Sequence, residues 1–173
     1  MIKRIALVGS SSTGKTTVYE LLKNKLPKYE FINESTRTVM RYGYPINEEG
    51  TDETQLAILA FHLKALLKPF NLVLDRCMLD TLVYSLITDV DEKTISYVKD
   101  CFEEVKDEYT HVVYFPIEFA SVDDGERTTN EEWRKLADDT FLMYLKKYYG
   151  ERFLTVSGSP MQRVNQILEY IER

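Results

Sequence analysis

A stretch of small polar residues separates two regular patterns near the start of the chain. Residues 3–8 are mostly apolar and predict a buried strand, while apolar residues recur at helical spacing over 15–26. Between them, residues 9–16 read Gly-Ser-Ser-Ser-Thr-Gly-Lys-Thr and match the pattern G-x-x-x-x-G-K-[ST] without a gap. The strand, the loop and the helix therefore predict a phosphate-binding turn at the carboxyl end of a strand.

The residue types in this loop suit a phosphate group. Small side chains let backbone N–H groups curl around phosphate oxygens, and the following helix N-terminus favours negative charge. Lys15 is expected to reach the β- and γ-phosphates, and the Thr16 hydroxyl to bind Mg²⁺. The residues predicted to hold the nucleotide in this loop are Gly9, Ser11, Ser12, Thr13, Gly14, Lys15, Thr16 and Thr17.

Strand and helix patterns alternate along the rest of the chain. Further strands are expected at residues 29–33, 71–75, 110–116 and 152–158. Helices are expected between them and at the end of the sequence; their ranges are 15–26, 34–43, 51–68, 78–87, 91–108, 131–150 and 160–173. This alternation predicts an α/β fold in which helices cover both faces of a parallel sheet. We expect one domain over residues 1–173, because no linker or repeat interrupts the pattern.

Charge and composition narrow the partners and the compartment. The net charge of −6 argues against a broad nucleic-acid surface, which needs clustered Lys and Arg, but permits a small phosphorylated ligand. Cys77 and Cys101 are the two cysteines, and they suit a reducing compartment. No apolar run approaches 18 residues. We therefore expect a soluble cytoplasmic protein, monomeric or homodimeric, that binds neither a membrane nor extended nucleic acid.

Charged residues follow the second and third predicted strands. Glu34 and Arg37 come after the second strand, and Asp75, Arg76 and Asp80 come at or after the end of the third. In an open parallel sheet ligands bind beyond the carboxyl ends of the strands, so these residues are candidates for the substrate site. Asp75 is a candidate for accepting a hydroxyl proton or anchoring Mg²⁺, and the arginines for clamping phosphate. Helix capping and simple ion pairs are the alternatives for the same residues.

The polar connection at 117–134 is a candidate lid. It carries Asp123, Asp124, Gly125 and Arg127 between the fourth strand and a long helix. A mobile segment of this kind brings cations to a phosphoryl group in transfer, and Arg127 is the residue expected to do so. A solvated loop of mixed charge is the alternative.

The motifs in combination resemble the P-loop nucleoside and nucleotide kinases. The likeness is greatest to the ribosylnicotinamide kinase domain of bifunctional NAD-biosynthesis proteins and related P-loop ATPase and kinase families. It is carried by GSSSTGKTT, NESTR, the helix from Gln55, LDRCMLDTLVYS, DDGER and VSGSPMQR. The resemblance implies a three-layer α/β/α kinase fold, a five-stranded parallel sheet of order 2-3-1-4-5 and a short lid. It also implies ATP and Mg²⁺, with an adenine-side loop over 157–163 that includes Ser159.

We therefore expect a kinase that moves the ATP γ-phosphoryl group to a nucleoside-type hydroxyl. Lys15, Asp75 and Arg127 are the expected catalytic residues, Thr16 and Asp75 the expected metal ligands, and the substrate residues are Glu34, Arg37, Arg76 and Asp80. The pair Asp75-Arg76 is more like that of thymidylate and deoxynucleoside kinases, which leaves a nucleoside monophosphate as the alternative acceptor. A polynucleotide 5′-kinase and a regulatory ATPase are further alternatives. Gln55 and His62 are interpreted as core or helix surface, and residues 43–53 as a possible substrate-side loop.

Overall fold

The computed structural model describes residues 2–121 and 128–172. Its centre is a parallel sheet of five strands in the order β2-β3-β1-β4-β5. The strands are β1 Arg4–Val8, β2 Glu30–Ile32, β3 Leu72–Asp75, β4 His111–Tyr114 and β5 Phe153–Thr155. The predicted α/β class and strand order are confirmed, and the strands are up to four residues shorter than their sequence patterns.

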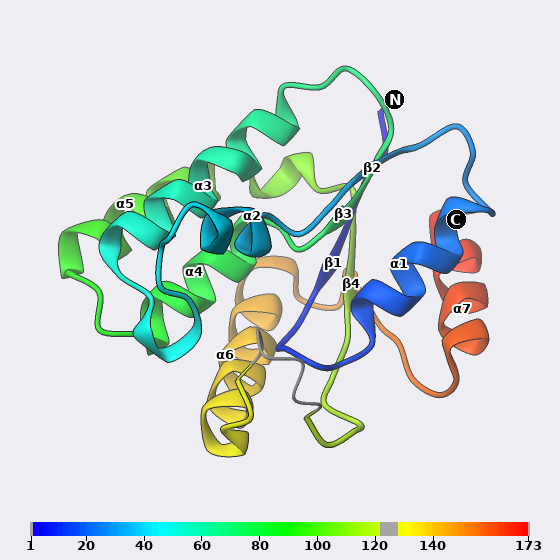
Figure 1. Ribbon diagram of the computed structural model, residues 1–173. Coiled ribbons are helices and arrows are strands. Elements are labelled where there is room, and N and C mark those ends of the chain that lie inside the picture. The colour runs from blue at the N-terminus through cyan, green and yellow to red at the C-terminus, as the bar shows by residue number, and fades with distance from the viewer. Residues whose placement is uncertain (1, 122–127, 173) are drawn as a thin grey trace.

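Helices cover both faces of this sheet (Figure 1). The main helices are α1 Lys15–Lys23, α2 Ser35–Arg41, α3 Asp52–Leu66, α4 Met78–Ile87, α5 Glu92–Val105, α6 Glu131–Tyr149 and α7 Pro160–Glu172. Two 3₁₀ turns, η1 Asn47–Glu49 and η2 Lys106–Glu108, follow α2 and α5. None of the helices in the described ranges combines the length and the apolar character that crossing a membrane requires.

Alternating strand residues build a separate core on each face. Ile5, Leu7, Val73 and Val113 point to the side covered by α1 and α7. Their neighbours Ala6, Val8, Leu72, Leu74 and Val112 point to the side covered by α3, α4, α5 and α6. Because the three central strands β1, β3 and β4 are buried on both faces, their sequences are mostly continuous apolar runs rather than alternating ones.

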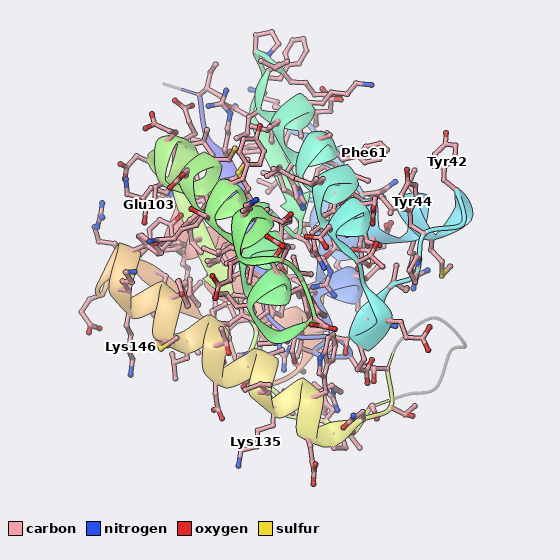
Figure 2. The ribbon with its side chains drawn as sticks, turned by 90° about the vertical axis from the view of Figure 1, so that its left-hand side faces the viewer. Tyr42, Tyr44, Phe61, Glu103, Lys135 and Lys146 are labelled. Carbon is pink, nitrogen blue, oxygen red and sulfur yellow. The ribbon has the colours of Figure 1, made fainter. Side chains whose placement is uncertain are left out.

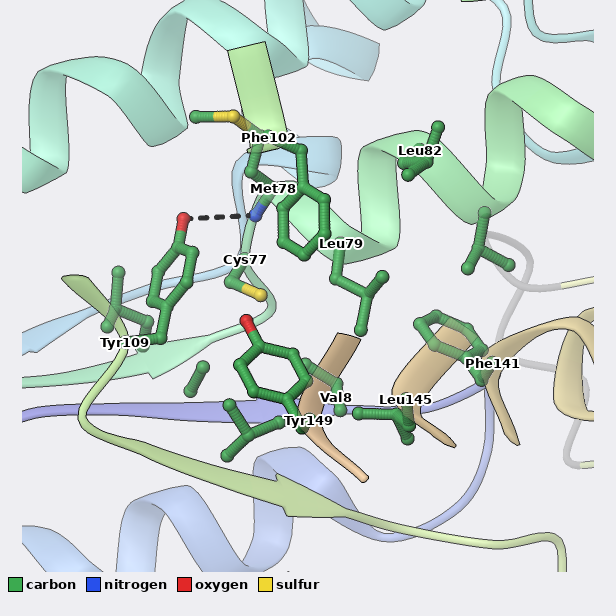
Figure 3. Close-up of a cluster of buried hydrophobic side chains, with 14 of the residues drawn as sticks. Val8, Cys77, Met78, Leu79, Leu82, Phe102, Tyr109, Phe141, Leu145 and Tyr149 are labelled. Atoms are coloured by element: carbon green, nitrogen blue, oxygen red, sulfur yellow. Dashed lines mark hydrogen bonds between the residues drawn. The ribbon is translucent and has the colours of Figure 1, made fainter. Parts of the chain in front are cut away.

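The larger core is anchored by α4 and α6. Met78, Leu79 and Leu82 from α4 pack against Phe141 and Leu145 from α6 (Figure 3). The Tyr109 hydroxyl accepts a hydrogen bond from the Met78 backbone N–H at 3.3 Å. This bond satisfies a donor in the first turn of α4, which has no partner within its own helix. The core therefore fixes the start of α4, next to the carboxyl end of β3.

Candidate active site

The phosphate loop runs from Gly9 to Thr16 between β1 and α1. Gly9, Ser12 and Gly14 have φ of +135°, +56° and +83°, which curls the backbone at the mouth of the helix. Gly14 is the N-cap of α1 and provides no side-chain cap for the first N–H groups. These groups, together with the positive end of the helix dipole, form a cradle for an anion.

The Lys15 ammonium is folded into this cradle. Lys15 is buried, and its Nζ donates to the Gly9 carbonyl at 2.8 Å, to the Ser10 carbonyl and to Thr13 Oγ1 at 3.1 Å. Burial, and secondly the nearby Arg76 charge, lower the pKa of Lys15 to about 7. A bound phosphate would supply the negative charge that favours the protonated form.

A hydrogen bond between Thr16 and Asp75 joins the first turn of α1 to the end of β3. The Thr16 hydroxyl donates to Asp75 Oδ2 at 2.9 Å, and Asp75 is buried. Burial, followed by the Glu34 charge, raises the pKa of Asp75. Its other oxygen, Oδ1, is buried without a hydrogen-bond partner among the described residues. A hydroxyl beside a carboxylate with an unused oxygen fits Mg²⁺, which takes one or two protein oxygens and completes its shell with water and phosphate.

Arg76 is the centre of a charged cluster between β2 and β3. Its φ of +77° turns the chain away from the sheet at the end of β3. The guanidinium donates to Glu34 Oε1 at 2.6 Å, to Asp80 Oδ1 at 3.1 Å, to the Gly9 carbonyl at 3.3 Å and to the Tyr84 hydroxyl at 3.3 Å. Arg76 therefore holds the β2 end, the phosphate loop and α4 in one arrangement.

Asp80 and Arg37 complete this cluster. Asp80 Oδ2 also accepts from the Cys77 backbone N–H at 2.9 Å, so Asp80 both caps α4 and binds Arg76. Arg37 Nε lies 3.9 Å from Glu34 Oε2 and is partly exposed. The residues predicted at the two strand ends are thus brought together, as the parallel sheet requires.

A pocket beside this cluster has a mixed apolar and polar lining. It contains about 670 Å³ of space, part of it open to solvent; its lining residues are Ser11, Glu34, Thr36, Arg37, Ile46, Asn47, Thr54, Gln55, Ile58, His62, Arg76, Asp80, Thr81, Tyr84 and Trp133. We call it the acceptor pocket. The Tyr84 and Trp133 rings stack on each other with centroids 5.4 Å apart. Burial lowers the pKa of His62 to about 3, so its ring is neutral.

Several polar atoms around the acceptor pocket lack partners within the described residues. They are Gln55 Oε1, His62 Nε2, Thr81 Oγ1 and Trp133 Nε1. A buried polar group without a partner costs on the order of 1–3 kcal/mol, so these atoms favour a ligand that carries both donors and acceptors. The interpretation of Gln55 and His62 as plain core missed this: both are buried, but the void that they line cannot be seen in a sequence pattern.

Two other pockets adjoin the phosphate loop. The first, the phosphate pocket, is lined by Ser12, Thr13, Gly14, Lys15, Thr16, Thr17, Glu34, Asp75 and Arg76. The second, the donor-base pocket, is lined by Ser12, Gly14, Thr17, Val18, Phe119, Ala120, Gly158, Pro160 and Arg163. Ser159 is not in that lining: its hydroxyl accepts from the Gln162 N–H at 3.4 Å in the first turn of α7. Its neighbours Gly158 and Pro160 lie there instead.

Two buried arginines support the phosphate loop: Arg134, the last residue of the candidate lid segment 117–134, and Arg163, the last residue of the expected adenine-side loop 157–163. Arg163 donates to the Thr13 carbonyl at 2.6 Å and to Glu118 Oε2 at 2.9 Å. Arg134 binds Glu131 and donates to the Ser11 carbonyl at 3.3 Å. Each arginine shares a helix face with buried apolar residues, and this is the signal that could have identified them.

The candidate lid is only partly described. Arg127, with Asp123, Asp124 and Gly125, lies outside the described residues, so its predicted role stays a prediction. At the start of the segment that leads into α6, the Thr128 hydroxyl donates to Glu48 Oε1 at 2.6 Å. This bond joins the base of the lid to residues 43–53, and Ile46 and Asn47 of that segment line the acceptor pocket.

Solved structures with the same fold include complexes with NR, AMP-PNP and dCMP. A NadR protein in complex with NR matches with a TM-score of 0.82 and 18% identity, covering 99% of this chain and 52% of that one. A second NadR structure, with NAD and AMP-PNP, has a TM-score of 0.77 and 16% identity, so this chain spans about half the length of these two proteins.

Other structures match over nearly their whole length. Deoxyadenosine kinase from M. mycoides with dCMP and dCDP has a TM-score of 0.75 and 18% identity, covering 98% of both chains. Thymidylate kinase from Candida albicans has a TM-score of 0.69 and 17% identity, covering 99% of this chain and 91% of that one. At these identities the likeness establishes the fold.

The family comparison covers most of the sequence. The comparison with curated proteins returned no match. A family model described as an AAA domain matches residues 4–163, which run from the start of β1 to the first turn of α7. The chain therefore belongs to this AAA domain family and has the fold of the P-loop nucleoside and nucleotide kinases.

Proposed function

We propose that the protein is a kinase that transfers the γ-phosphoryl group of ATP to a hydroxyl group of a nucleoside-type molecule. One observation carries this proposal: Glu34 and Arg76 line both the phosphate pocket and the acceptor pocket. A ligand in each pocket would therefore meet at these two side chains. In-line transfer needs this arrangement, because catalysis of phosphoryl transfer is mainly positioning and charge stabilisation.

The donor side is supplied by the phosphate loop. The N–H groups at the start of α1 bind phosphate oxygens, and Lys15 moves its hydrogen bonds from the Gly9 and Ser10 carbonyls to the β- and γ-phosphates. The donor-base pocket suits adenine, since Phe119 and Arg163 offer an aromatic ring and a planar cation. Arg127 remains our candidate for a lid cation.

Thr16 and Asp75 are the residues that would hold Mg²⁺. When bound, this ion neutralises charge on the transferring phosphoryl group. Asp75 lines the phosphate pocket and is not part of the acceptor-pocket lining, which supports the metal role over the general-base role.

Glu34 is better placed than Asp75 to receive the acceptor proton. Glu34 lines both pockets, Arg76 Nε lies 2.6 Å from its Oε1, and Arg37 Nε lies 3.9 Å from its Oε2. A hydroxyl nucleophile gains from a positioned carboxylate as its proton leaves. The hydrogen bond from Arg76 Nε to Glu34 Oε1, at 2.6 Å, holds this carboxylate in place between the two pockets, where it can orient the hydroxyl.

The charge balance of the acceptor pocket favours a nucleoside over a monophosphate. Glu34 and Asp80 contribute two negative charges, and Arg37 and Arg76 two positive ones. Arg76 is already bound by both carboxylates, so a dianionic phosphate would have to displace them. The partly exposed Arg37 is the observation that keeps a nucleoside monophosphate kinase as the second candidate, because it can approach a phosphate at the pocket mouth.

The ligands bound in similar structures support the same class of acceptor. NadR was solved with NR, and the deoxyadenosine kinase with dCMP and dCDP as products. A polynucleotide 5′-kinase is a weaker candidate because the net charge of −6 does not favour binding to nucleic acid. A regulatory ATPase is a weaker candidate because the acceptor pocket offers a binding site for a small acceptor beside the phosphate loop. A cytoplasmic location remains an expectation from the sequence.

The test is a transfer assay with γ-labelled ATP and a panel of acceptors. The panel contains nucleosides including nicotinamide riboside, nucleoside monophosphates, a DNA 5′ end and water alone. We expect label on a nucleoside, and label only on a monophosphate or only in free phosphate would overturn the proposal.

Two carboxylate variants separate the roles. Glu34→Gln is expected to lower kcat by about 10²-fold, the scale of a lost general base, at any Mg²⁺ concentration. Asp75→Asn is expected to lose a similar amount and to recover part of it at high Mg²⁺. Glu20→Gln, on the exposed side of α1, is the matched control and should leave the rate unchanged.

A further inference from the structure

Helix α3 has an inner face that lines the acceptor pocket and an outer face that is largely exposed. Its inner face carries Thr54, Gln55, Ile58 and His62, which line the acceptor pocket. Its outer face points away from the protein and comprises Glu53, Leu56, Ala57, Ala60, Phe61 and Lys64. Ala57 is half-buried and the other five are exposed.

The outer face of α3 is apolar for a surface helix. Leu56 and Phe61 expose 39% and 38% of their surface, and the two alanines lie between them on the helix. A helix at the surface of a soluble domain normally shows a polar outer stripe. Glu53 and Lys64 are the charged residues of this face, one near each end, and neither forms an ion pair within residues 2–121 and 128–172.

These six residues are symmetric about the midpoint between Ile58 and Leu59. Glu53 and Lys64 are equidistant from that point, as are Leu56 and Phe61, and Ala57 and Ala60. We propose that this face binds a second copy of the same chain, with the two α3 helices antiparallel across a two-fold axis. Each residue then meets its symmetric counterpart, which is the requirement of an isologous interface.

In this antiparallel arrangement, the facing residues of the two helices match in charge and in size. Glu53 of one copy faces Lys64 of the other, and the two-fold axis generates this ion pair twice. The two charged positions are 11 residues apart, which is about 16 Å along a helix with a rise of about 1.5 Å per residue. Alanines at the axis let the helix backbones approach closely, and the larger Leu56 and Phe61 side chains pack against each other on either side.

The surrounding surface extends the contact on one side. Figure 2 shows Tyr42 and Tyr44 on the same side of the molecule as Phe61, and they are exposed by 75% and 38%. A single helix pair buries less than the roughly 1,200–2,000 Å² of a standard interface, so these aromatic residues contribute area. We therefore expect a dimer that dissociates on dilution rather than an obligate one.

Dimer formation would also affect the acceptor pocket. The residues that form the interface and the residues that line the pocket alternate along the same helix. A partner on the outer face would restrict the motion of α3 and so of Gln55 and His62. The proposal does not depend on which reaction the site catalyses.

Charge reversal tests the predicted pairing by sedimentation equilibrium of the full chain from 1 to 100 µM. Lys64→Glu places two Glu–Glu contacts across the axis and should weaken the dimer at least tenfold. The double variant Glu53→Lys/Lys64→Glu restores opposite charges and should recover wild-type association. Lys135→Glu on α6, also exposed, is the matched control and should have no effect (Figure 2).

A steric variant tests the axis itself. Ala60→Glu puts a large charged side chain against Ala57 of the other copy and should leave a monomer with an unchanged far-ultraviolet circular dichroism spectrum. A wild-type chain that stays monomeric at 100 µM overturns the proposal. So does a dimer whose dissociation constant is the same in the wild type, Lys64→Glu and Ala60→Glu.

Discussion

Gly9 is the position where the phosphate loop leaves least room for a side chain. Its φ is +135°, outside the regions that L-residues occupy readily. A Cβ built at Gly9 would lie 2.5 Å from the Phe115 carbonyl oxygen and 3.3 Å from its carbon. Phe115 belongs to the segment after β4, and its N–H donates to the Val8 carbonyl at 2.9 Å. A side chain at Gly9 must therefore push two paired strand ends apart.

The cost of Gly9→Ala can be worked from these numbers. The left-handed backbone costs about 1–2 kcal/mol for a non-glycine residue, and the steric overlap about 1–3 kcal/mol. Alanine also restricts the unfolded chain, which returns about 0.4–1 kcal/mol. The net loss in free energy of unfolding is about 1–5 kcal/mol. For a chain of this length, that corresponds to a Tm lower by roughly 2–20 °C.

The difference in free energy of unfolding between Gly9→Ala and Gly43→Ala, measured by urea unfolding, isolates the cost of the steric overlap at Gly9. Gly43 has a φ of +90°, but nothing lies within 4 Å of a Cβ built there. Gly43→Ala therefore carries the backbone cost without the overlap, and Gly9→Ala should be less stable by a further 1–3 kcal/mol or so. If the two variants differ by less than about 0.5 kcal/mol, the close approach of Phe115 to the loop does not constrain it.

The loop and the sheet were predictable because their signals are local. The residues from Gly9 to Thr16 indicate the phosphate-binding turn by themselves, and the apolar runs indicate the strands. The boundaries were less accurate: α1 ends at Lys23 rather than residue 26, and α3 covers Asp52–Leu66 within the predicted 51–68. Ends of this kind depend on capping and packing, to which a periodic pattern is only weakly sensitive.

The polar lining of the acceptor pocket was not predictable from the same patterns. His62 lies on the buried face of α3 with Ile58 and Leu59, so its spacing predicts core. His62 is part of a site because it lines a pocket together with Trp133 and Tyr84, which come from other helices. Arg134 is similar: its acceptor, the Ser11 carbonyl, is 123 residues away in the chain. Local periodicity shows that a residue is buried, but it does not show which atoms from distant parts of the chain that residue contacts.

Three further predictions test the loop, the core and a buried histidine. Lys15→Ala should abolish phosphoryl transfer in the labelled-ATP assay and leave the fold intact, with Lys23→Ala as the control; unchanged turnover would end the kinase proposal. Phe141→Ala should lower the urea-measured free energy of unfolding by about 3–5 kcal/mol, because its ring is fully buried in the larger core. His62 should make stability fall as pH drops. Burial lowers its pKa to about 3, whereas in the unfolded chain it titrates near 6.5, so between these values the unfolded state binds the extra proton. Stability therefore rises with pH in that window, and the loss from pH 6.5 to pH 5 is about 2 kcal/mol. His62→Asn should remove this slope in urea unfolding measured from pH 5 to 7, and His111→Asn, at a half-buried position, should remove less of it. An unchanged slope in His62→Asn would show that the His62 ring is not held neutral by burial.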